Sequence, residues 1–256
     1  MLSKNKIKLI RSLQTKKGRE TEKCYVAEGD RIFKELIQTN SKIIEIIALP
    51  EWIEQNKPLI KNIPFETASR DELHAISSLT TPQSVLCIVA IKGPTLVIDD
   101  LSSQLVIALD RIQDPGNMGT IIRVANWFGI HSILCSNDCV DIYNAKVVQA
   151  TMGAICKTDI FYCDLANTLQ YYIQKTNNPI YGTFLEGENI YTCSLKQSAI
   201  IVLGNEGNGI SHEIEKTINS RITIPSFNSS VAVESLNVSI AASIVCSEFK
   251  RRIILA

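Results

Sequence analysis

From residue 105 onward, short apolar stretches alternate with segments of helical periodicity, and this alternation restricts the fold more than any other feature. Stretches with the length and apolar content of strands occur at 105–109, 132–135, 159–162, 180–184, 199–203 and 221–225. Apolar strands separated by helices are typical of a mostly parallel sheet covered on both faces. The sequence therefore predicts an α/β domain that binds ligands beyond the carboxyl ends of its strands.

The N-terminal region alternates helix and strand patterns at shorter intervals. Residues 30–39 have helical spacing of apolar side chains, Ser69 is placed to cap a helix that follows it, and 84–91 has the composition of a strand. Gly93 and Pro94 open a stretch without sustained helical pattern. We therefore predict a smaller α/β domain over 1–92, a linker over 93–104 and the larger domain over 105–256.

Composition disfavours several classes of protein. No apolar run approaches the ~18 residues of a membrane span, and the N-terminus lacks the apolar core of a signal peptide, so we expect a cytoplasmic protein. The eight cysteines form no CxxC pair and lie mostly in apolar runs, which indicates reduced thiols in the core. The three histidines are far apart in the sequence, so we expect no metal site.

The net charge of zero conceals a basic N-terminus. Residues 1–19 contain no acidic residue. Charge alone fits a solvated helix face as well as it fits a surface for the phosphate backbone of a nucleic acid. The cations in question are Lys4, Lys6, Lys8, Arg11, Lys16, Lys17 and Arg19.

Polar and glycine-rich loops follow two of the predicted strands. In the first, "DRIQDPGNMG" at 110–119, Asn117 is suited to cap the helix that follows, and Arg123 falls on another face of that helix from its apolar residues. In the second, "LGNEGNGI" at 203–210, three glycines surround Glu206. The second loop has no Gly-Lys-Ser/Thr sequence, and its carboxylate would repel phosphate, so a neutral or cationic ligand fits it better.

A third polar segment, "VESLNVSIAAS" at 233–243, follows the last strand. Ser235, Asn237 and Ser239 open an otherwise apolar helix that we predict over about 236–253. Taken alone, each of these residues fits an ordinary helix cap. Together with the other two loops, however, they lie at the same edge of one predicted sheet, and this joint occurrence favours a functional site.

Together, "NMGTIIRVANWFG", "IVLGNEGNGI" and "ESLNVSIAAS" resemble, in order and spacing, the three signature motifs of the SpoU (TrmH) family of RNA ribose 2′-O-methyltransferases, within the SPOUT superfamily. The resemblance covers about 105–252, and 144–155 is similar to the family's helix between the first two motifs. Residues 1–92 resemble the substrate-binding domain, similar to ribosomal protein L30e, that many members carry. The basic N-terminus thereby acquires an RNA-binding interpretation.

The resemblance implies a trefoil-knotted α/β fold that binds S-adenosylmethionine, in a homodimer whose active site lies at the interface. It implies cofactor contacts from Leu203, Gly204, Ile224, Ser235 and Leu236. Arg123 matches the family's catalytic arginine, and Asn117, Glu206, Ser235 and Asn237 would orient Arg123 or the ribose. An arginine normally stays protonated, so we expect Arg123 to position the nucleotide phosphate and stabilise the developing alkoxide.

Two segments depart from the family pattern. Family members often show Asn-Pro-Lys and Arg-Ala-Ser-Met-Gly where this chain has Asn144-Ala145-Lys146 and Gln149-Ala150-Thr151-Met152-Gly153, so any role of that arginine is absent or moved. The loop 226–233 is longer than usual, which would reshape the entrance for cofactor or RNA.

The N-terminal extension favours 23S ribosomal RNA as the substrate, with transfer RNA as the alternative. A catalytically silent RNA-binding homologue is a further alternative, and the intact motif residues argue against it. A dinucleotide-dependent enzyme is disfavoured because no GxGxxG follows the first strand of the predicted sheet.

Overall fold

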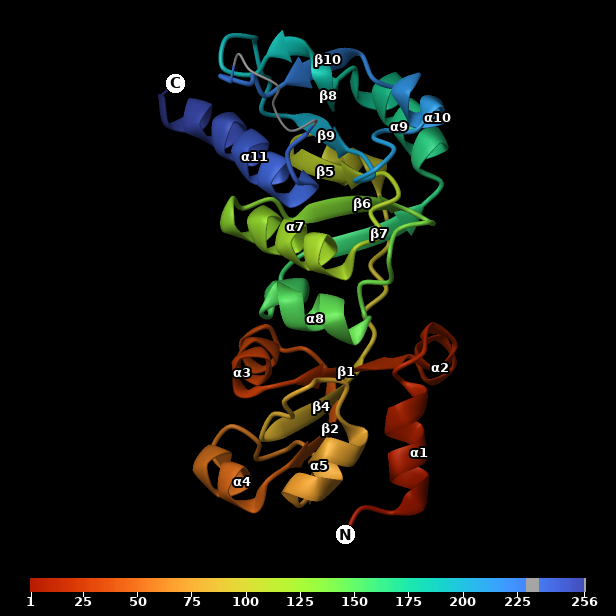
Figure 1. Ribbon diagram of the computed structural model, residues 1–256, viewed down its shortest axis with the longest axis vertical. Coiled ribbons are helices and arrows are strands. Elements are labelled where there is room, and N and C mark those ends of the chain that lie inside the picture. Colours follow the sequence, from red (N-terminus) through yellow and green to blue (C-terminus); the bar gives the residue numbers. More distant parts are fainter. Residues whose placement is uncertain (229–234, 256) are drawn as a thin grey trace. The chain divides into compact units, whose positions relative to one another are not determined.

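The computed structural model describes residues 1–228 and 235–255, with side chains as far as Arg252. The chain forms two compact units, each built on a sheet of its own (Figure 1). Unit 1 comprises Met1–Gly93 with Asp141–Lys157, and unit 2 comprises Pro94–Val140 with Thr158–Ala256.

Unit 1 contains a four-stranded sheet in the order β1-β4-β2-β3, in which only the β2–β3 pair is parallel. The serine predicted as a cap starts α5, because the Ser69 hydroxyl accepts the Glu72 N–H and the Glu72 carboxylate accepts the Ser69 N–H. The elements are α1 (Lys4–Ser12), α2 (Lys16–Glu22), β1 (Cys24–Glu28), α3 (Asp30–Gln38), β2 (Ile43–Ala48), α4 (Pro50–Asn56), β3 (Phe65–Thr67), α5 (Arg70–Ile76) and β4 (Val85–Ala90).

The segment 141–157, which belongs to the predicted larger domain in sequence, packs within unit 1. It contains α8 (Ala145–Thr151) and the 3-10 turn η1 (Ala154–Cys156). The ring of Tyr143 lies 4.6 Å from that of Tyr25, and the Lys157 ammonium lies 2.5 Å from the Glu35 carboxylate. Asn144 caps α8 by accepting the Lys146 N–H at 2.9 Å.

Within its described residues, unit 2 is built on a six-stranded sheet in the order β10-β8-β9-β5-β6-β7, and all pairings between these strands are parallel. Five of the predicted strands match within two residues, whereas β8 runs on to Asn189 because it re-pairs with β10 after a register shift. The strands are β5 (Leu105–Leu109), β6 (Ser132–Ser136), β7 (Asp159–Cys163), β8 (Ile180–Asn189), β9 (Ala199–Leu203) and β10 (Ser220–Thr223).

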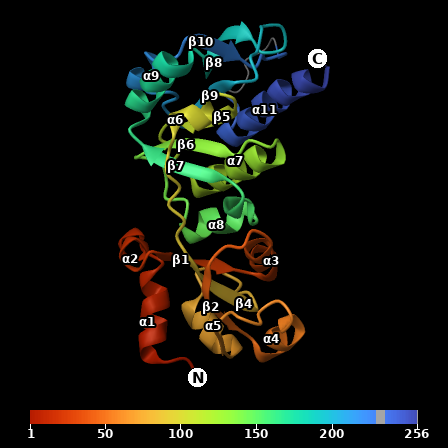
Figure 2. The same ribbon diagram turned by 180° about the vertical axis from the view of Figure 1, so that it is seen from behind.

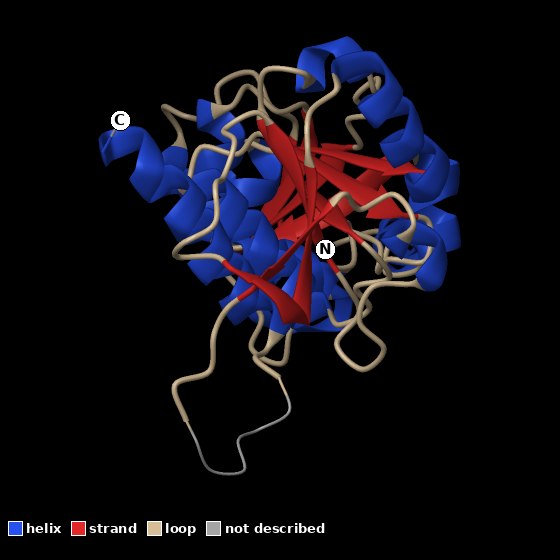
Figure 3. Ribbon diagram, turned by 90° about the horizontal axis from the view of Figure 1, so that it is seen from above, coloured by secondary structure: helices blue, strands red, loops and turns tan. Residues whose placement is uncertain are grey.

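Helices cover both faces of this sheet. Helices α7 (Pro115–Trp127) and α11 (Val238–Leu255) pack together on one face, and α9 (Leu165–Thr176), with α6 (Ile98–Leu101) and α10 (His212–Glu215), lies on the other (Figures 1 and 2). Figure 3 shows the helices of the protein in blue and its strands in red. Tyr172 and Leu169 of α9 are buried against Val106 and Ala108 of β5.

This architecture confirms the predicted mixed α/β fold with a mostly parallel sheet and a smaller N-terminal part. The trefoil knot stays a prediction. Among the described helices, none combines the length and the apolarity that a membrane span would need.

All eight cysteines are free thiols, and five of them are buried. Burial raises the pKa of the Cys87 thiol, and it raises that of Cys246 to about 12. Both are therefore protonated at neutral pH and fill the core as small apolar groups, as the sequence predicts.

Candidate active site

Two loops begin side by side at the carboxyl ends of β5 and β9, which are parallel neighbours. The pairing continues one residue beyond the strands, because the Asp110 N–H donates to the Leu203 carbonyl at 2.9 Å. The loop after β5 leads into α7, and the loop after β9 leads into α10. Two of the three motif segments therefore leave the sheet at one point of its carboxyl edge.

The loop after β9 is a closed turn. Asn205 and Gly209 donate N–H groups to each other's carbonyls at 3.0 and 2.9 Å. Gly209 has φ of 64°, in the left-handed region that favours glycine. Gly204 is pressed against the far side of the turn, where a Cβ would lie 2.3 Å from the backbone carbon of Gly209.

We predict that Gly204→Ala opens this turn. The added methyl has no free space, so we expect a loss of about 1–3 kcal/mol in the free energy of unfolding and a large loss of S-adenosylmethionine affinity. Gly207→Ala is the matched control, because a Cβ there makes only ordinary contact at 3.7 Å. Calorimetric unfolding and cofactor titration of both variants check the prediction, and equal behaviour of the two would contradict it.

A chain of three side chains joins α7, the glycine loop and the start of α11. Asn117 donates from Nδ2 to Glu206 Oε1 at 2.9 Å, and Asn237 donates from Nδ2 to Asn117 Oδ1 at 2.9 Å. Asn237 Oδ1 in turn accepts the N–H of Ser239, in the first turn of α11. Residues 89 and 120 positions apart in the sequence are thus brought into direct contact.

The Glu206 carboxylate is the exposed end of this chain. Its Oε2 has one long contact, 3.4 Å from Asn205 Nδ2. An ionised carboxylate has about four lone-pair sites, so Glu206 keeps acceptor capacity toward solvent. The arrangement can therefore hold a carboxylate in a fixed place and offer it to a hydroxyl donor.

The prediction that Asn117 caps α7 is wrong. The helix begins two residues earlier, at Pro115, and its cap is Asp114, whose Oδ1 accepts the Asn117 N–H at 2.8 Å. Proline suits the first helical position because no N–H is needed there. With Asp114 as the cap, the side chain of Asn117 is available to Glu206.

Arg123 lies apart from the chain of Asn117, Glu206 and Asn237. It is exposed, and it forms no hydrogen bond or ion pair with residues that the structure describes. It lies six positions after Asn117, which corresponds to about 9 Å along α7. It shares a helix face with Trp127, one turn further on, whose side chain is 85% exposed. Within one subunit, Arg123 therefore does not contact Glu206.

The positions predicted to contact the cofactor differ in exposure. Leu203 is buried, Gly204 and Ile224 are half-buried, and Ser235 and Leu236 are exposed. Part of the longer loop predicted at 226–233 falls outside the described residues. An open apolar side chain at Leu236, glycine backbone and a nearby carboxylate suit a largely apolar, cationic ligand better than a polyphosphate. This donor set fits S-adenosylmethionine.

The basic N-terminal side chains have unequal surroundings. Arg19 is only 3% exposed, and its guanidinium bonds Asp141 and the Leu13 carbonyl at 2.5–2.9 Å. Lys6 pairs with Glu45, and Arg11 donates to a backbone carbonyl. Arg19 is thus committed to the fold, and the exposed cations without such bonds among the described residues are Lys4, Lys8, Lys16 and Lys17.

We predict opposite consequences for the two kinds of cation. Replacing Lys16 and Lys17 by alanine should lower RNA affinity several-fold. It should also reduce the slope of log K against log salt concentration by about one to two, because up to two phosphate contacts are lost. Arg19→Ala leaves Asp141 unpaired and should cost about 3 kcal/mol of unfolding free energy. RNA titrations at several salt concentrations and thermal melts separate the two effects; unchanged RNA binding by the double variant would contradict the first.

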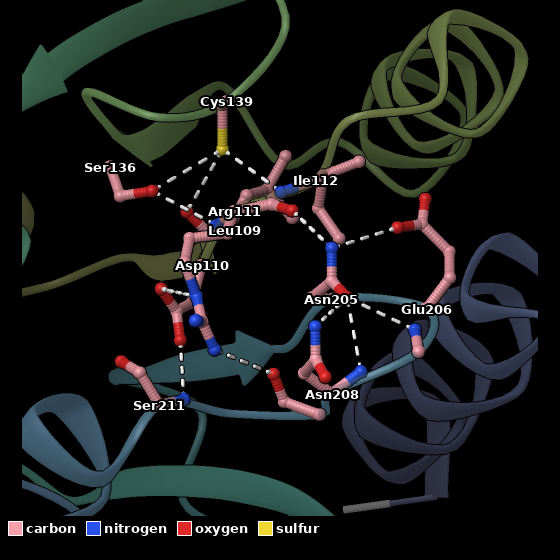
Figure 4. Close-up of polar contacts among 12 residues, drawn as sticks. Leu109, Asp110, Arg111, Ile112, Ser136, Cys139, Asn205, Glu206, Asn208 and Ser211 are labelled. Carbon is pink, nitrogen blue, oxygen red and sulfur yellow. Dashed lines mark hydrogen bonds and ion pairs between the residues drawn. The ribbon is translucent and has the colours of Figure 1, made fainter.

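Sequence reasoning missed Asp110, Arg111 and Asn205, which surround the base of the glycine loop (Figure 4). Asp110 is 2% exposed, and its Oδ2 accepts the Ser211 N–H at 2.6 Å. A charged pair directly after a buried strand was the available signal. The same close-up shows Cys139 beside them, whose pKa is lowered by hydrogen bonds from Cys135, from Ser136 and from backbone N–H groups.

Comparison with known proteins gives two family matches. The model described as the SpoU rRNA Methylase family matches residues 104–247, and the model described as the MRM3-like substrate binding domain matches residues 4–87. The family resemblance predicted from the three motifs is confirmed by these matches.

Individual relatives agree. The chain is 32% identical to the 23S rRNA (guanosine-2'-O-)-methyltransferase RlmB of Neisseria meningitidis, over 76% of this chain and 79% of that protein. It is 25% identical to the 23S rRNA (guanosine(2553)-2'-O)-methyltransferase RlmP of Bacillus subtilis, over 94% of both. A solved structure of a putative RNA methyltransferase of the TrmH family from Porphyromonas gingivalis superimposes with a TM-score of 0.85 at 34% identity, covering 98% of this chain and 99% of that one.

Proposed function

This chain belongs to the SpoU rRNA Methylase family, and from that premise we propose that it methylates a ribose 2′-hydroxyl of 23S ribosomal RNA. Membership makes it an S-adenosylmethionine-dependent RNA methyltransferase, the enzyme class and cofactor that the motifs predict. The relatives RlmB and RlmP both carry names that specify 23S ribosomal RNA and ribose methylation, and the chain spans most of their length.

The contact of Asn117 with Glu206 and Asn237 carries the proposal. Each residue comes from a different motif segment, and each of the two side-chain hydrogen bonds measures 2.9 Å. A structural cap would explain Asn237 alone, but it would not require a carboxylate and an amide from two other elements. We therefore assign this group to the ribose.

When bound, S-adenosylmethionine supplies the methyl group, and the protein supplies position and electrostatics. Glu206 accepts the hydrogen bond of the ribose 2′-hydroxyl, because its Oε2 remains open. Asn117 holds the carboxylate in place through the other oxygen. Arg123 supplies a cation close to the hydroxyl, which stabilises the negative charge that develops on the ribose oxygen.

Because Arg123 does not reach Glu206 within one chain, we propose that it serves the site of a second copy in a homodimer. The face that carries Arg123 exposes Trp127, and the start of α11 exposes Ile240 at 51%. The neighbouring groove is lined by Phe128, Tyr191, Ile244 and Arg251. Exposed large apolar side chains beside a groove on two packed helices are typical of a protein interface.

We propose residues 1–92 as the RNA-binding domain and the cytoplasm as the location. The exposed lysines of α1 and α2 would contact the phosphate backbone, and the match to a substrate-binding domain supports this part of the proposal. Contacts of this kind position the protein without reading sequence, so the target nucleotide must be recognised elsewhere.

The experiment that tests the substrate is a map of 2′-O-methyl positions in RNA from cells with and without this gene. The proposal expects one ribose position in 23S ribosomal RNA to lose its methyl group when the gene is deleted. Loss confined to a transfer RNA would replace the proposed substrate, and an unchanged map would favour a silent RNA-binding homologue.

A further inference from the structure

The dipeptide Asp110–Arg111 contacts both arms of the loop that carries Glu206. On one arm, Asn205 Nδ2 donates to the Arg111 carbonyl at 2.8 Å. On the other arm, the Ser211 N–H donates to Asp110 Oδ2 at 2.6 Å, and Arg111 Nη2 lies 3.5 Å from the Gly209 carbonyl. The loop is therefore held by hydrogen bonds on both sides of Glu206, and all of these bonds are to Asp110 or Arg111 (Figure 4).

The backbone of Arg111 is in a conformation that an arginine rarely adopts. Its φ is 56°, in the left-handed region, where most side chains are disfavoured. This conformation lets its N–H donate to Ser136 Oγ at 2.9 Å while its carbonyl faces Asn205. Strained backbone of this kind persists where the surroundings over-determine it, often beside functional sites.

The dipeptide is itself anchored to the end of β6. Besides the bond from Arg111 to Ser136, the following N–H, of Ile112, donates to Cys139 Sγ at 3.3 Å. The guanidinium of Arg111 lies 3.4 Å from the buried Asp110 carboxylate and compensates its charge. The glycine loop is thus connected through Asp110 and Arg111 to the carboxyl end of β6, the strand that pairs with β5.

Asn205 links this anchor to Glu206 itself. Its Oδ1 accepts the N–H of Gly207 and of Asn208, both at 3.0 Å, and so fixes the turn around Glu206. Its Nδ2 reaches the Arg111 carbonyl. One side chain therefore shapes the turn and fastens it to the anchor.

We propose that Asp110, Arg111 and Asn205 are positioning residues, which hold Glu206 where its carboxylate can bind both Asn117 and the ribose. This inference rests on the proposed function of Glu206. None of the three needs to touch substrate or cofactor to act. Their effect on the reaction would be on the turnover number, because a misplacement of about 1 Å at a reacting group lowers rates by roughly a hundredfold.

The test uses Asn205→Asp in the full-length protein. The aspartate keeps the acceptor for the N–H groups of Gly207 and Asn208. It removes the Nδ2 donor, which reaches the Arg111 carbonyl at 2.8 Å and makes the longer contact of 3.4 Å with Glu206, so the turn keeps its shape and its attachment to Arg111 is lost. Asn219→Asp is the matched control: Asn219 Oδ1 accepts the Ile180 N–H at 2.9 Å, and its Nδ2 has no bond to a described residue. Ser136→Ala is an independent variant. It removes the hydroxyl that accepts the Arg111 N–H, and Ser136 itself has no hydrogen bond to the described residues of the loop.

Methylation of an unmodified 23S ribosomal RNA transcript and hydrogen–deuterium exchange of 204–210 are measured for all three variants. For Asn205→Asp we expect kcat to fall about 10- to 100-fold with KM for RNA within about threefold, together with faster exchange in the loop. For Ser136→Ala we expect a smaller change of the same pattern, and for Asn219→Asp neither change.

Wild-type kcat and wild-type loop exchange in Asn205→Asp would overturn the positioning role. Equal losses in Asn205→Asp and Asn219→Asp would overturn it too, since the effect would then follow the charge and not the fastening. If the wild-type protein transfers no methyl group to RNA, the proposed function falls, and the exchange of 204–210 alone decides whether these residues hold the loop.

Discussion

Arg123→Ala should lower kcat for RNA methylation by about 10²–10³-fold while S-adenosylmethionine affinity stays within about threefold of wild type. The reason is that Arg123 makes no bond to described residues of its own chain, so its removal costs the fold little. Its loss would be felt where charge develops on the ribose oxygen. Single-turnover methylation and calorimetric cofactor titration measure the two quantities.

Lys175→Ala is the control for this prediction. Lys175 is also an exposed cation of unit 2, but it lies on α9, on the opposite face of the sheet from α7. Its removal should leave both quantities unchanged. Near-normal turnover by Arg123→Ala would remove the guanidinium from the mechanism, and a parallel loss of cofactor binding would show that it acts on the cofactor instead.

Mixing two inactive variants should restore activity if Arg123 serves the second subunit's site. In a heterodimer of Arg123→Ala with Glu206→Gln, one site combines an intact Glu206 with the partner's intact Arg123, and the other site has neither. Random exchange at equal concentrations gives half heterodimers with one working site in two, or about one quarter of wild-type activity. Co-expressed variants, with dimer content measured by light scattering, provide the assay.

Activity of the mixture equal to the mean of the two separate variants, in a preparation shown to contain heterodimers, would contradict the shared site. It would place Arg123 and Glu206 in the same subunit's reaction, and α7 would then have to rearrange on RNA binding. A monomeric wild-type protein would contradict the homodimer directly.

The strands β5, β6 and β9 could be predicted from the sequence because they are almost entirely buried on both sides. A stretch such as 199–203 is apolar throughout, and every one of its residues is buried in β9. The end of β8 could not be predicted, since its exposed half is held by pairing with β10 after a register shift, and pairing leaves no mark in hydrophobicity.

The sequence singled out Asn117, Glu206 and Asn237, but it did not show that their side chains contact one another. Asparagine is a common helix cap, which favoured Asn117 for that role. Asp114, three residues earlier, caps α7 instead, because proline at 115 fixes where the helix begins. Arg19 is a cation in a basic segment, which predicts an RNA contact. Its ion pair with Asp141, 122 positions away in the sequence, is visible only in the structure and shows that the side chain is buried. The charged pair at 110–111 is visible in the sequence, but the positive φ of Arg111, which turns its carbonyl toward Asn205, is not.

The central claim is that this chain places a methyl group on a ribose oxygen of RNA. Its most direct test is transfer of labelled methyl from S-adenosylmethionine to an unmodified 23S ribosomal RNA transcript by the wild-type protein, followed by digestion to nucleosides. The account predicts label in a single 2′-O-methylnucleoside. Label on a base, or no label in RNA while the cofactor still binds, would contradict it.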